Sequence, residues 1–342
     1  MEPSAYIPAY LERLYVRSHP GLTEGGRSLL HERIVRDPDS YATTDHARAL
    51  LSYAHARDAL LQELDRMEDL PDEAFEPRCA QLFEQTRSKL YGIWQADQLC
   101  FDAQLVDILL ADAPLDARLN DLLRVERAAR EHLLGTAAGF DPEAPLLWNE
   151  SVLAANGMDP AEATRTNPEV IGWLHALETL AQECLFTARY RAAASYAQTV
   201  MRAPGYPNGA LGTLLLALAR LEDEDAFFAA ARSAEATVED SPWFLLGRTL
   251  LLYKLGRRRS AKRALRDFVN RCEGGAFFLL NPTYLTPYLP VRPKPRERWE
   301  RTHQAIWEAD GIIVDTPDFT AWAAEVEGVQ ESSEEFARRN GF

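Results

Sequence analysis

The sequence predicts an all-α protein: a right-handed solenoid of helical hairpins, with extra helices before it and a proline-rich strap near its C-terminal end. Three observations lead to this prediction. Apolar residues recur at threes and fours through nearly the whole chain, as amphipathic helices require. Ala193, Ala226 and Ala261 occupy similar places in three similar segments, 33 and 35 residues apart, a period typical of stacked helical repeats. Strand-like runs are scarce, and the best one, Ile312–Val314, is too short to anchor a sheet.

Length and composition indicate a folded protein. The chain has 342 residues, of which 46% are hydrophobic and 26% charged, so it can bury a sizeable core. Its four cysteines lie far apart without CxxC spacing, which predicts buried thiols in a reducing compartment. We see no signal peptide, and the longest apolar run, Leu211–Ala219, is about half of what a membrane span needs. We therefore expect a cytoplasmic protein that has no contact with a membrane.

Five regions follow from the pattern of helices and breakers. They are an N-terminal helical region (1–138), an irregular connector with short helices (139–167), the repeats (168–280), the proline-rich strap (281–298) and C-terminal helices with a polar tail (299–342). Helix starts are marked by a capping residue followed by proline at Asp141, Asp159, Ser241 and Thr316. We expect the last two helices at about 299–311 and 317–327, and we expect the strap to lie extended on the helical stack.

The repeat segment resembles the tetratricopeptide repeat family. Its first repeat contains ARYRAAASYAQTVMR, and its third contains PWFLLGRTLLLYKLGRRRSAKRALRDFVNR with a leucine-glycine turn. Small residues at Ala193, Ala226 and Ala261 would let two helices approach closely, with larger residues interlocking between them. A single hairpin cannot cover its own apolar face, so the resemblance implies a stack of neighbouring hairpins.

The segment from Asn167 through Trp322 also resembles the suppressor-of-tumorigenicity 7 family and its bacterial relatives. The shared order is LxxLA, RYRxA, SPWFL, LxxLG, NPxxxxPYLP and TPDFTAW. The vertebrate members look membrane-associated, whereas this chain shows no span, so their localisation does not carry over. The resemblance implies a helical scaffold and suggests no catalytic chemistry.

A groove is the first candidate site, because the first helix of each tetratricopeptide hairpin lines the concave face. The alanine alignment places these residues there: His175, Glu178, Gln182, Phe186, Asn208, Leu211, Leu215, Trp243, Leu250, Tyr253 and Lys254. Relatives that clamp a peptide carboxylate use asparagine and lysine at such places, and only Asn208 and Lys254 fit. The leucines favour packing against another element, either the PYLP segment or a partner helix.

A basic helix is the second candidate. The chain carries a net charge of −15, yet 13 Lys or Arg and 4 Asp or Glu fall between Lys254 and Arg301, a local net of +9. The basic patch is Arg257, Arg258, Arg259, Lys262, Arg263 and Arg266, opposite an apolar side at Ala261, Ala264, Leu265 and Phe268. It would suit an acidic ligand, including the acidic part of a second copy, so a homo-oligomer is one expected outcome. We do not expect nucleic acid as a partner, because the chain as a whole is acidic.

Catalytic and cofactor signatures are missing from the sequence. There is no HExxH, GxSxG, P-loop or GxGxxG motif. The best metal candidates, Asp45, His46, His55 and Asp58, do not share one helix face, because His46 and His55 lie nine residues apart. The same nine-residue spacing separates His175 from Cys184, so these two residues would point to different faces of one helix and would not form a nucleophile pair. We expect neither a metal, nor a cofactor, nor catalytic residues.

The first hypothesis is a non-enzymatic scaffold that binds a protein or peptide through its helical-repeat surface. The alternatives are an enzyme or metal-dependent protein with its site between the N-terminal helices and the repeats, and a nucleic-acid-associated regulator that uses the basic helix at 257–266.

Overall fold

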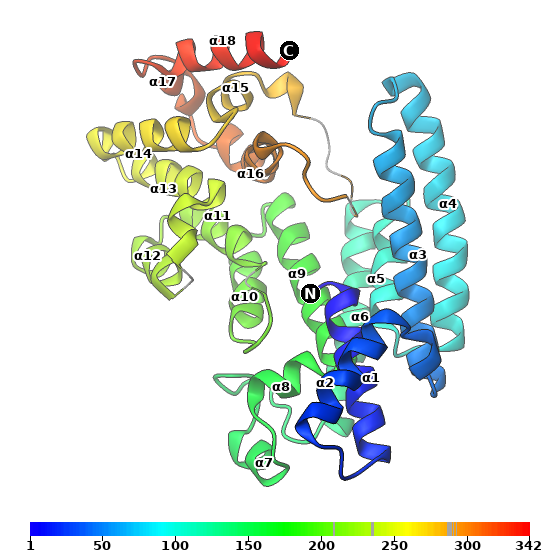
Figure 1. The fold of residues 1–342 in the computed structure, drawn as a ribbon. Coiled ribbons are helices and arrows are strands. Elements are labelled where there is room, and N and C mark those ends of the chain that lie inside the picture. The colour runs from blue at the N-terminus through cyan, green and yellow to red at the C-terminus, as the bar shows by residue number, and fades with distance from the viewer. Residues whose placement is uncertain (208, 234–235, 286–288, 290, 292) are drawn as a thin grey trace. The chain divides into compact units, whose positions relative to one another are not determined.

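The computed structural model describes residues 1–207, 209–233, 236–285, 289, 291 and 293–342 (Figure 1). Over these residues the protein is built from 18 α-helices and three 3-10 helices. They contain no strand, and the only β-type pairing among them is an isolated bridge between Phe140 and Trp148. The predicted all-α class is confirmed.

The chain forms two compact units. Unit 1 comprises residues 1–180, 199–207 and 290–293, and unit 2 comprises residues 181–198, 208–289 and 294–342. Helices α9 (Pro168–Phe186) and α10 (Tyr190–Met201) contribute to both units.

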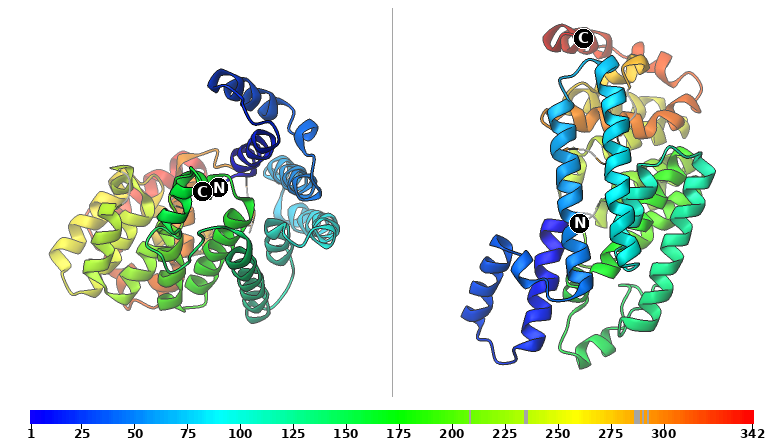
Figure 2. Two further views of the ribbon diagram at one scale, coloured as in Figure 1. Left: turned by 90° about the horizontal axis from the view of Figure 1, so that it is seen from below. Right: turned by 90° about the vertical axis from the view of Figure 1, so that its right-hand side faces the viewer.

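Unit 1 is organised around two long helices that pack as a hairpin, α3 and α4, seen as the pair of long rods in Figure 2. Helix α5 packs on α4, α6 packs on α5, and α1 contacts α2, α3 and α8. The helices of this unit before α9 are α1 (Pro3–Ser18), α2 (Glu24–Arg36), α3 (Asp45–Met67), α4 (Asp72–Ala96), α5 (Phe101–Leu109), α6 (Leu115–Thr136), α7 (Glu150–Ala155) and α8 (Pro160–Arg165), with the 3-10 helix η1 (Asp39–Tyr41).

The predicted helix starts have mixed outcomes. At Asp159 the carboxylate accepts a hydrogen bond from the backbone N–H of Glu162 at 2.8 Å, and α8 begins at the next residue. Helix α13 also begins after Ser241, but without a side-chain cap. Asp141 starts no helix: its carboxylate accepts from the N–H of Glu143 and stabilises a turn instead. The hydroxyl of Thr316 donates backward to the carbonyl of Ile312, so it closes the preceding helix.

Unit 2 carries the hairpins and their covering helices. Helix α11 contacts α12 and α13, α13 contacts α14, and α16 contacts both α11 and α13. The helices after α10 are α11 (Leu211–Leu221), α12 (Glu224–Ser233), α13 (Pro242–Lys254), α14 (Arg258–Arg271), α15 (Gly275–Leu280), α16 (Arg298–Val314), α17 (Phe319–Ala324) and α18 (Val329–Asn340), with η2 (Ala236–Asp240) and η3 (Pro282–Tyr284).

Three hairpin turns in this unit repeat with a period of 34 residues. The residues in the turn with a left-handed backbone are Ala188, Glu222 and Gly256, with φ of 58°, 61° and 71°. In each turn the next residue's N–H bonds back to the carbonyl five residues earlier: Arg189 to Cys184 at 2.8 Å, Asp223 to Leu218 at 3.1 Å and Arg257 to Leu252 at 3.0 Å. This pattern closes a helix C-terminus and reverses the chain. The same local geometry therefore recurs at one spacing, although only the third turn has glycine.

The turn geometry corrects the register read from the alanines. A constant period of 34 pairs Ala193 with Phe227 and Ala261, each of which is the fourth residue of its helix, and all three are buried. Ala226 is only half-buried. Phe227 fits this position because Gly247 in the next helix makes room: a Cβ at Gly247 would lie 3.2 Å from the Phe227 ring. At this contact the small residue is therefore Gly247 of α13, and α12 carries the large residue Phe227.

The C-terminal end differs from the predicted helices and tail. Helix α16 runs through Val314, so the strand-like Ile312–Val314 run is the last turn of a helix. The expected polar tail is helix α18, which buries Val329, Ser333 and Phe336 along one face. Its apolar stripe is so sparse that the sequence looked uniformly polar. Residues 286–288, 290 and 292 of the strap lie outside the described residues, so its predicted extended course is visible only in part.

None of the helices in the described part of the chain combines the length and the apolar character needed to cross a membrane.

Candidate functional site

The predicted groove residues are already in contact with the chain's own side chains. Leu211, Leu215, Leu250 and Tyr253 are buried. His175, Glu178, Gln182, Phe186, Trp243 and Lys254 are half-buried, and Asn208 lies outside the described residues. His175 and Glu178 belong to unit 1, whereas the others that can be described belong to unit 2.

A buried carboxylate of α16 is the centre of the contacts in unit 2. Glu308 is 5% exposed. One of its oxygens accepts hydrogen bonds from the side-chain amides of Gln182 at 3.2 Å and Gln304 at 2.7 Å, and the other accepts from the indole of Trp243 at 2.6 Å. Such bonds to a charged acceptor are stronger than bonds between neutral groups. Glu308 therefore joins α16 to two predicted groove positions.

Aromatic contacts continue the same interface. The Phe186 ring meets Trp307 of α16 edge-on at 4.7 Å, and Tyr253 contacts Phe319 and Trp322 of the α17 region at 5.1 and 4.7 Å. Lys254 lies 3.5 Å from the carboxylate of Glu222. Helices α16 and α17 therefore contact the aromatic groove residues. The sequence had suggested the PYLP segment as the part of the chain that packs on the groove, and this segment lies largely outside the described residues.

A polar cluster in unit 1 surrounds His175, and no sequence motif indicated it. The Nδ1 atom of His175 lies 2.7 Å from a carboxylate oxygen of Asp102 in α5, and the other oxygen accepts from the hydroxyl of Tyr6 in α1 at 2.6 Å. The hydroxyl of Tyr206 donates to Glu178 at 2.7 Å. The Nε2 atom of His175 lies 2.7 Å from the nitrogen of Met1. Four separate segments thus contribute to one cluster, and no local motif could have shown it.

Burial determines the acid–base properties of this cluster. Burial raises the pKa of Tyr6 well above its ordinary value, and the nearby Asp102 carboxylate raises it further. The pKa of Tyr206 is raised in the same way, by burial and then by Glu178. For Asp102, burial acts to raise the pKa, but His175 and the hydrogen bonds from His175 and Tyr6 outweigh it, so the pKa is lowered. The cluster therefore holds an ionised carboxylate beside neutral phenols.

Histidines elsewhere do not assemble a metal site. The Nδ1 atom of His46 lies 2.5 Å from Asp97, and its Nε2 atom lies 3.6 Å from Glu169. His55 is exposed and lies 3.7 Å from Asp39. The two histidines among the predicted metal candidates therefore have different partners. No group of three or more His, Cys, Asp or Glu suited to hold a metal ion occurs in the residues that the structure describes.

The four cysteines are buried thiols. All are buried and none forms a disulfide. Burial raises the pKa of each thiol, for Cys272 to about 12, so the reactive thiolate is disfavoured.

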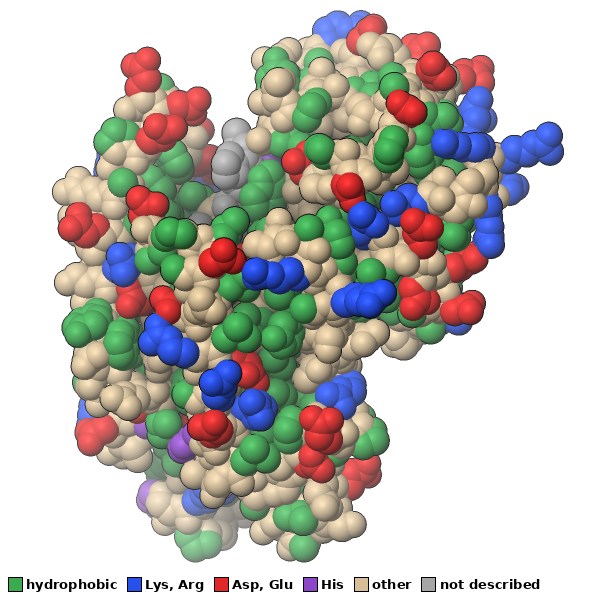
Figure 3. All heavy atoms as spheres, turned by 180° about the vertical axis from the view of Figure 1, so that it is seen from behind, with side chains coloured by type: hydrophobic (Ala, Val, Ile, Leu, Met, Phe, Trp, Pro, Cys, Tyr) green, Lys and Arg blue, Asp and Glu red, His purple; other side chains and the backbone are tan. Residues whose placement is uncertain are grey.

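The basic patch lies along the exposed side of α14. Lys and Arg side chains crowd the edge that α14 occupies, at the upper right of Figure 3. Arg257 and Arg266 are paired with Glu224 and Glu327 at 2.7 and 2.8 Å. The guanidinium of Arg258 lies 3.5 Å from the centre of the Tyr253 ring, a cation–π contact. Over the described ranges, no carboxylate forms an ion pair with the remaining three cations, Arg259, Lys262 and Arg263.

Over the described residues the fold is thus all-helical, α16 and α17 contact the predicted groove positions of unit 2, and α14 presents a basic outer side. No protein-family model, no curated protein and no solved structure matches the chain.

Proposed function

We propose that the protein is a cytoplasmic, non-enzymatic interaction scaffold whose hairpins α9–α10, α11–α12 and α13–α14 form a short tetratricopeptide-like stack. The observation that supports the stack is the hairpin turn that recurs with a period of 34 residues. This period is that of the tetratricopeptide repeat, and repeat stacks of this kind serve as extended binding surfaces. The likeness to the suppressor-of-tumorigenicity 7 family points the same way, since it suggests no catalytic chemistry.

The partner surface that we propose is the basic stripe of α14, defined as Arg259, Lys262, Arg263 and Arg266. These residues follow one another at the spacings of a single helix face. Like charges at i and i+4 cost a helix about 0.2–0.5 kcal/mol per pair, and two such pairs occur here. Positive charge in the first turn also opposes the helix dipole. An acidic protein or peptide bound along the stripe would remove both costs.

The binding test uses the full-length chain and a labelled glutamate-rich peptide. Reversing the three cations without an ion-pair partner, R259E/K262E/R263E, should weaken binding about tenfold or more, because it removes three charge pairs and introduces repulsion. The matched control is R27E/R33E/R36E on α2, which changes the net charge equally at exposed positions.

If both triple variants lose the same affinity for the peptide, the effect depends only on net charge, and the proposal is contradicted. Binding of duplex RNA in preference to the peptide would replace it with the nucleic-acid alternative. If the chain alone forms dimers that only R259E/K262E/R263E disrupts, the acidic partner is a second copy.

The Asp102–His175 pair is the one observation that favours the enzyme alternative. A buried carboxylate that orients an imidazole is a recurring arrangement for general-base catalysis. The test is a panel of hydrolysis and group-transfer assays with the wild type and H175Q. An activity that H175Q abolishes without loss of fold would establish an enzyme, and metal analysis of the purified protein would identify a metal-dependent one.

A further inference from the structure

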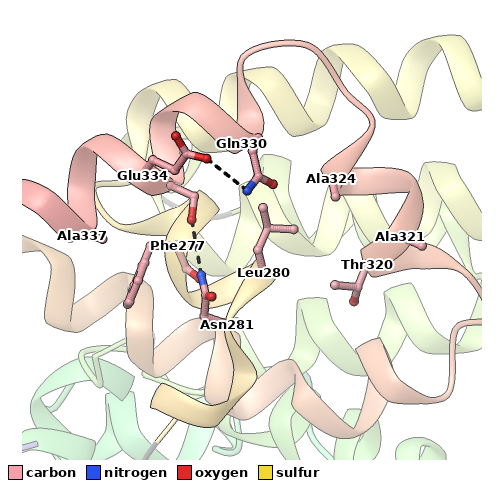
Figure 4. A pocket seen from close by; sticks show the side chains of 10 residues that line it. Phe277, Leu280, Asn281, Thr320, Ala321, Ala324, Gln330, Glu334 and Ala337 are labelled. Atoms are coloured by element: carbon pink, nitrogen blue, oxygen red, sulfur yellow. Dashed lines mark hydrogen bonds between the residues drawn. The ribbon is translucent and has the colours of Figure 1, made fainter. Parts of the chain in front are cut away.

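A cavity of about 350 Å³ lies between α15, α17 and α18 in unit 2 (Figure 4). Small-molecule sites have volumes of roughly 300–1,000 Å³, so the space is sufficient for a small group. Three elements line it: Phe277 and Leu280 with Asn281 at the end of α15, Thr320, Ala321 and Ala324 on α17, and Gln330, Ser333, Glu334 and Ala337 on α18.

The cavity exists because small side chains face it while aromatic packing holds its walls apart. Ala321 and Ala324 lie on one face of α17, and their methyl groups leave the space open. Helices α15 and α18 are fixed to each other by the contact of Phe277 with Phe336, whose ring centres are 5.4 Å apart. The side chain of Leu280 points into the space and supplies an apolar surface.

The polar groups on the wall are chiefly hydrogen-bond acceptors. The side-chain amide of Asn281 donates to the carbonyl of Phe277 at 2.9 Å and to the hydroxyl of Ser333 at 3.3 Å, which leaves its carbonyl oxygen to accept. Gln330 donates to one oxygen of Glu334 at 3.4 Å, and this carboxylate can accept several more bonds. The wall therefore suits a ligand rich in N–H groups.

The charge around the cavity also favours a ligand that carries N–H groups, and in particular a cation. None of the lining residues is Lys, Arg or His, and Glu334 is negative. Residues 319–337 contain five glutamates and no Lys, Arg or His, although Glu327 is paired with Arg266, and α18 continues into Arg338 and Arg339, of which Arg339 is paired with Glu273. A negative wall attracts cations and repels anions.

We propose that this cavity binds a primary ammonium or guanidinium group carried on an aliphatic stem. The stem would lie against Leu280 and the alanines, as basic side chains do when they cover apolar surface with the charge outward. Glu334 and the carbonyl oxygen of Asn281 accept from the cation. Small amines and the lysine or arginine side chain of another protein share this chemistry. The site uses neither the basic stripe of α14 nor the proposed scaffold function.

The test titrates the full-length chain by calorimetry with butylamine, agmatine, N-acetyl-lysine methylamide and, as an uncharged match for butylamine, butanol. The cations should bind more tightly than butanol, and E334Q should weaken their binding by about two- to fivefold, because Glu334 is exposed and solvent screens its charge. A324L should abolish binding by filling the space. The control is E335Q, because Glu335 is exposed on the same helix, as Glu334 is, but does not line the cavity.

Tighter binding of agmatine than of the capped lysine would assign the site to small amines, and the reverse order would assign it to a protein side chain. Equal weakening by E334Q and E335Q would mean diffuse attraction to acidic helices and would overturn the site, as would equal binding of butylamine and butanol. Circular dichroism verifies the fold of each variant. If A324L fails to fold, the comparison of E334Q with E335Q decides whether the cavity binds the cation.

Discussion

The two units of the molecule stabilise their interiors in different ways. In unit 1, ionisable groups from three helices meet inside the protein, at Tyr6, Asp102 and His175. In unit 2, the densest contacts are aromatic: Phe278 alone contacts the rings of Phe277, Trp299, His303, Phe336 and Phe342. The difference leads us to expect that the stability of unit 1 depends more on the protonation of buried side chains, whereas that of unit 2 depends more on the fit between aromatic rings.

The buried Glu308 refines this contrast, since unit 2 also contains a buried carboxylate. Three of its hydrogen bonds come from amide and indole groups, which do not titrate over the ordinary pH range. These three bonds add specificity to the packing of α16.

The largest effect that we expect is from F278A. Phe278 is 1% exposed, and truncating a buried phenylalanine costs about 3–5 kcal/mol through lost burial and the cavity left behind. Hydrogen exchange of the α15 and α18 amides should report faster opening of unit 2, with α1 and α5 little changed. V314A is the control, because Val314 is 77% exposed. Similar losses from both variants would show that the aromatic cluster does not dominate unit 2.

The next effect is from Y6F, which removes the hydroxyl that donates to Asp102. We expect a loss of about 1.5–3 kcal/mol, the range for hydrogen bonds to charged groups. The loss should appear in the exchange of α1 and α5 and leave α15 and α18 unaffected. An unchanged unfolding midpoint would contradict the central role of this cluster in unit 1.

The same cluster predicts a pH dependence with a definite sign. The folded-state pKa of Tyr6 and Tyr206 in this cluster is raised above the ordinary value of 10.0, as is that of Tyr53, a buried residue of α3 whose pKa is raised by burial and then by Asp102. The folded chain therefore holds these protons more tightly than the unfolded chain. The resulting stability is fully present below about pH 10 and is lost as pH rises through the folded pKa values. Alkaline titration followed by hydrogen exchange should open unit 1 before unit 2, and Y6F should reduce the difference. Opening of unit 2 first would reverse the comparison.

The smallest effect tests shape in unit 2. In G212A the new Cβ would lie 2.7 Å from Cδ1 of Trp243, so the indole that bonds Glu308 must shift, at a cost of about 1–3 kcal/mol. The matched control is G311A in α16, where a Cβ meets nothing within 4 Å and alanine should stabilise the helix by about 0.5–1 kcal/mol. Thermal unfolding should separate the two variants in opposite directions. An unfolding temperature that G212A leaves unchanged would show that the Trp243 indole is not held tightly in place.

Much of the local structure could be predicted because it depends on residues close in sequence. The 3.6-residue period of the apolar positions indicated helices throughout, and the Asp159-Pro160 pair marked a helix start that the structure confirms. The basic stripe of α14 was also predictable, since four cations at helical spacing opposite buried Ala261 and Phe268 must face outward. Helix α18 was missed because its buried face consists of only a few residues.

The sequence by itself thus determined the all-helical class, the approximate spacing of three helical hairpins and the basic helix. Tertiary structure alone decided the 34-residue register, in which Phe227 replaces a small residue because Gly247 on another helix accommodates it. It also decided that α16 covers the predicted groove through Glu308, and that Tyr6 and Asp102, 96 residues apart, share a hydrogen bond. The physical reason is that periodicity and capping act within a helical turn or two, whereas these contacts depend on complementary shapes and charges from distant segments.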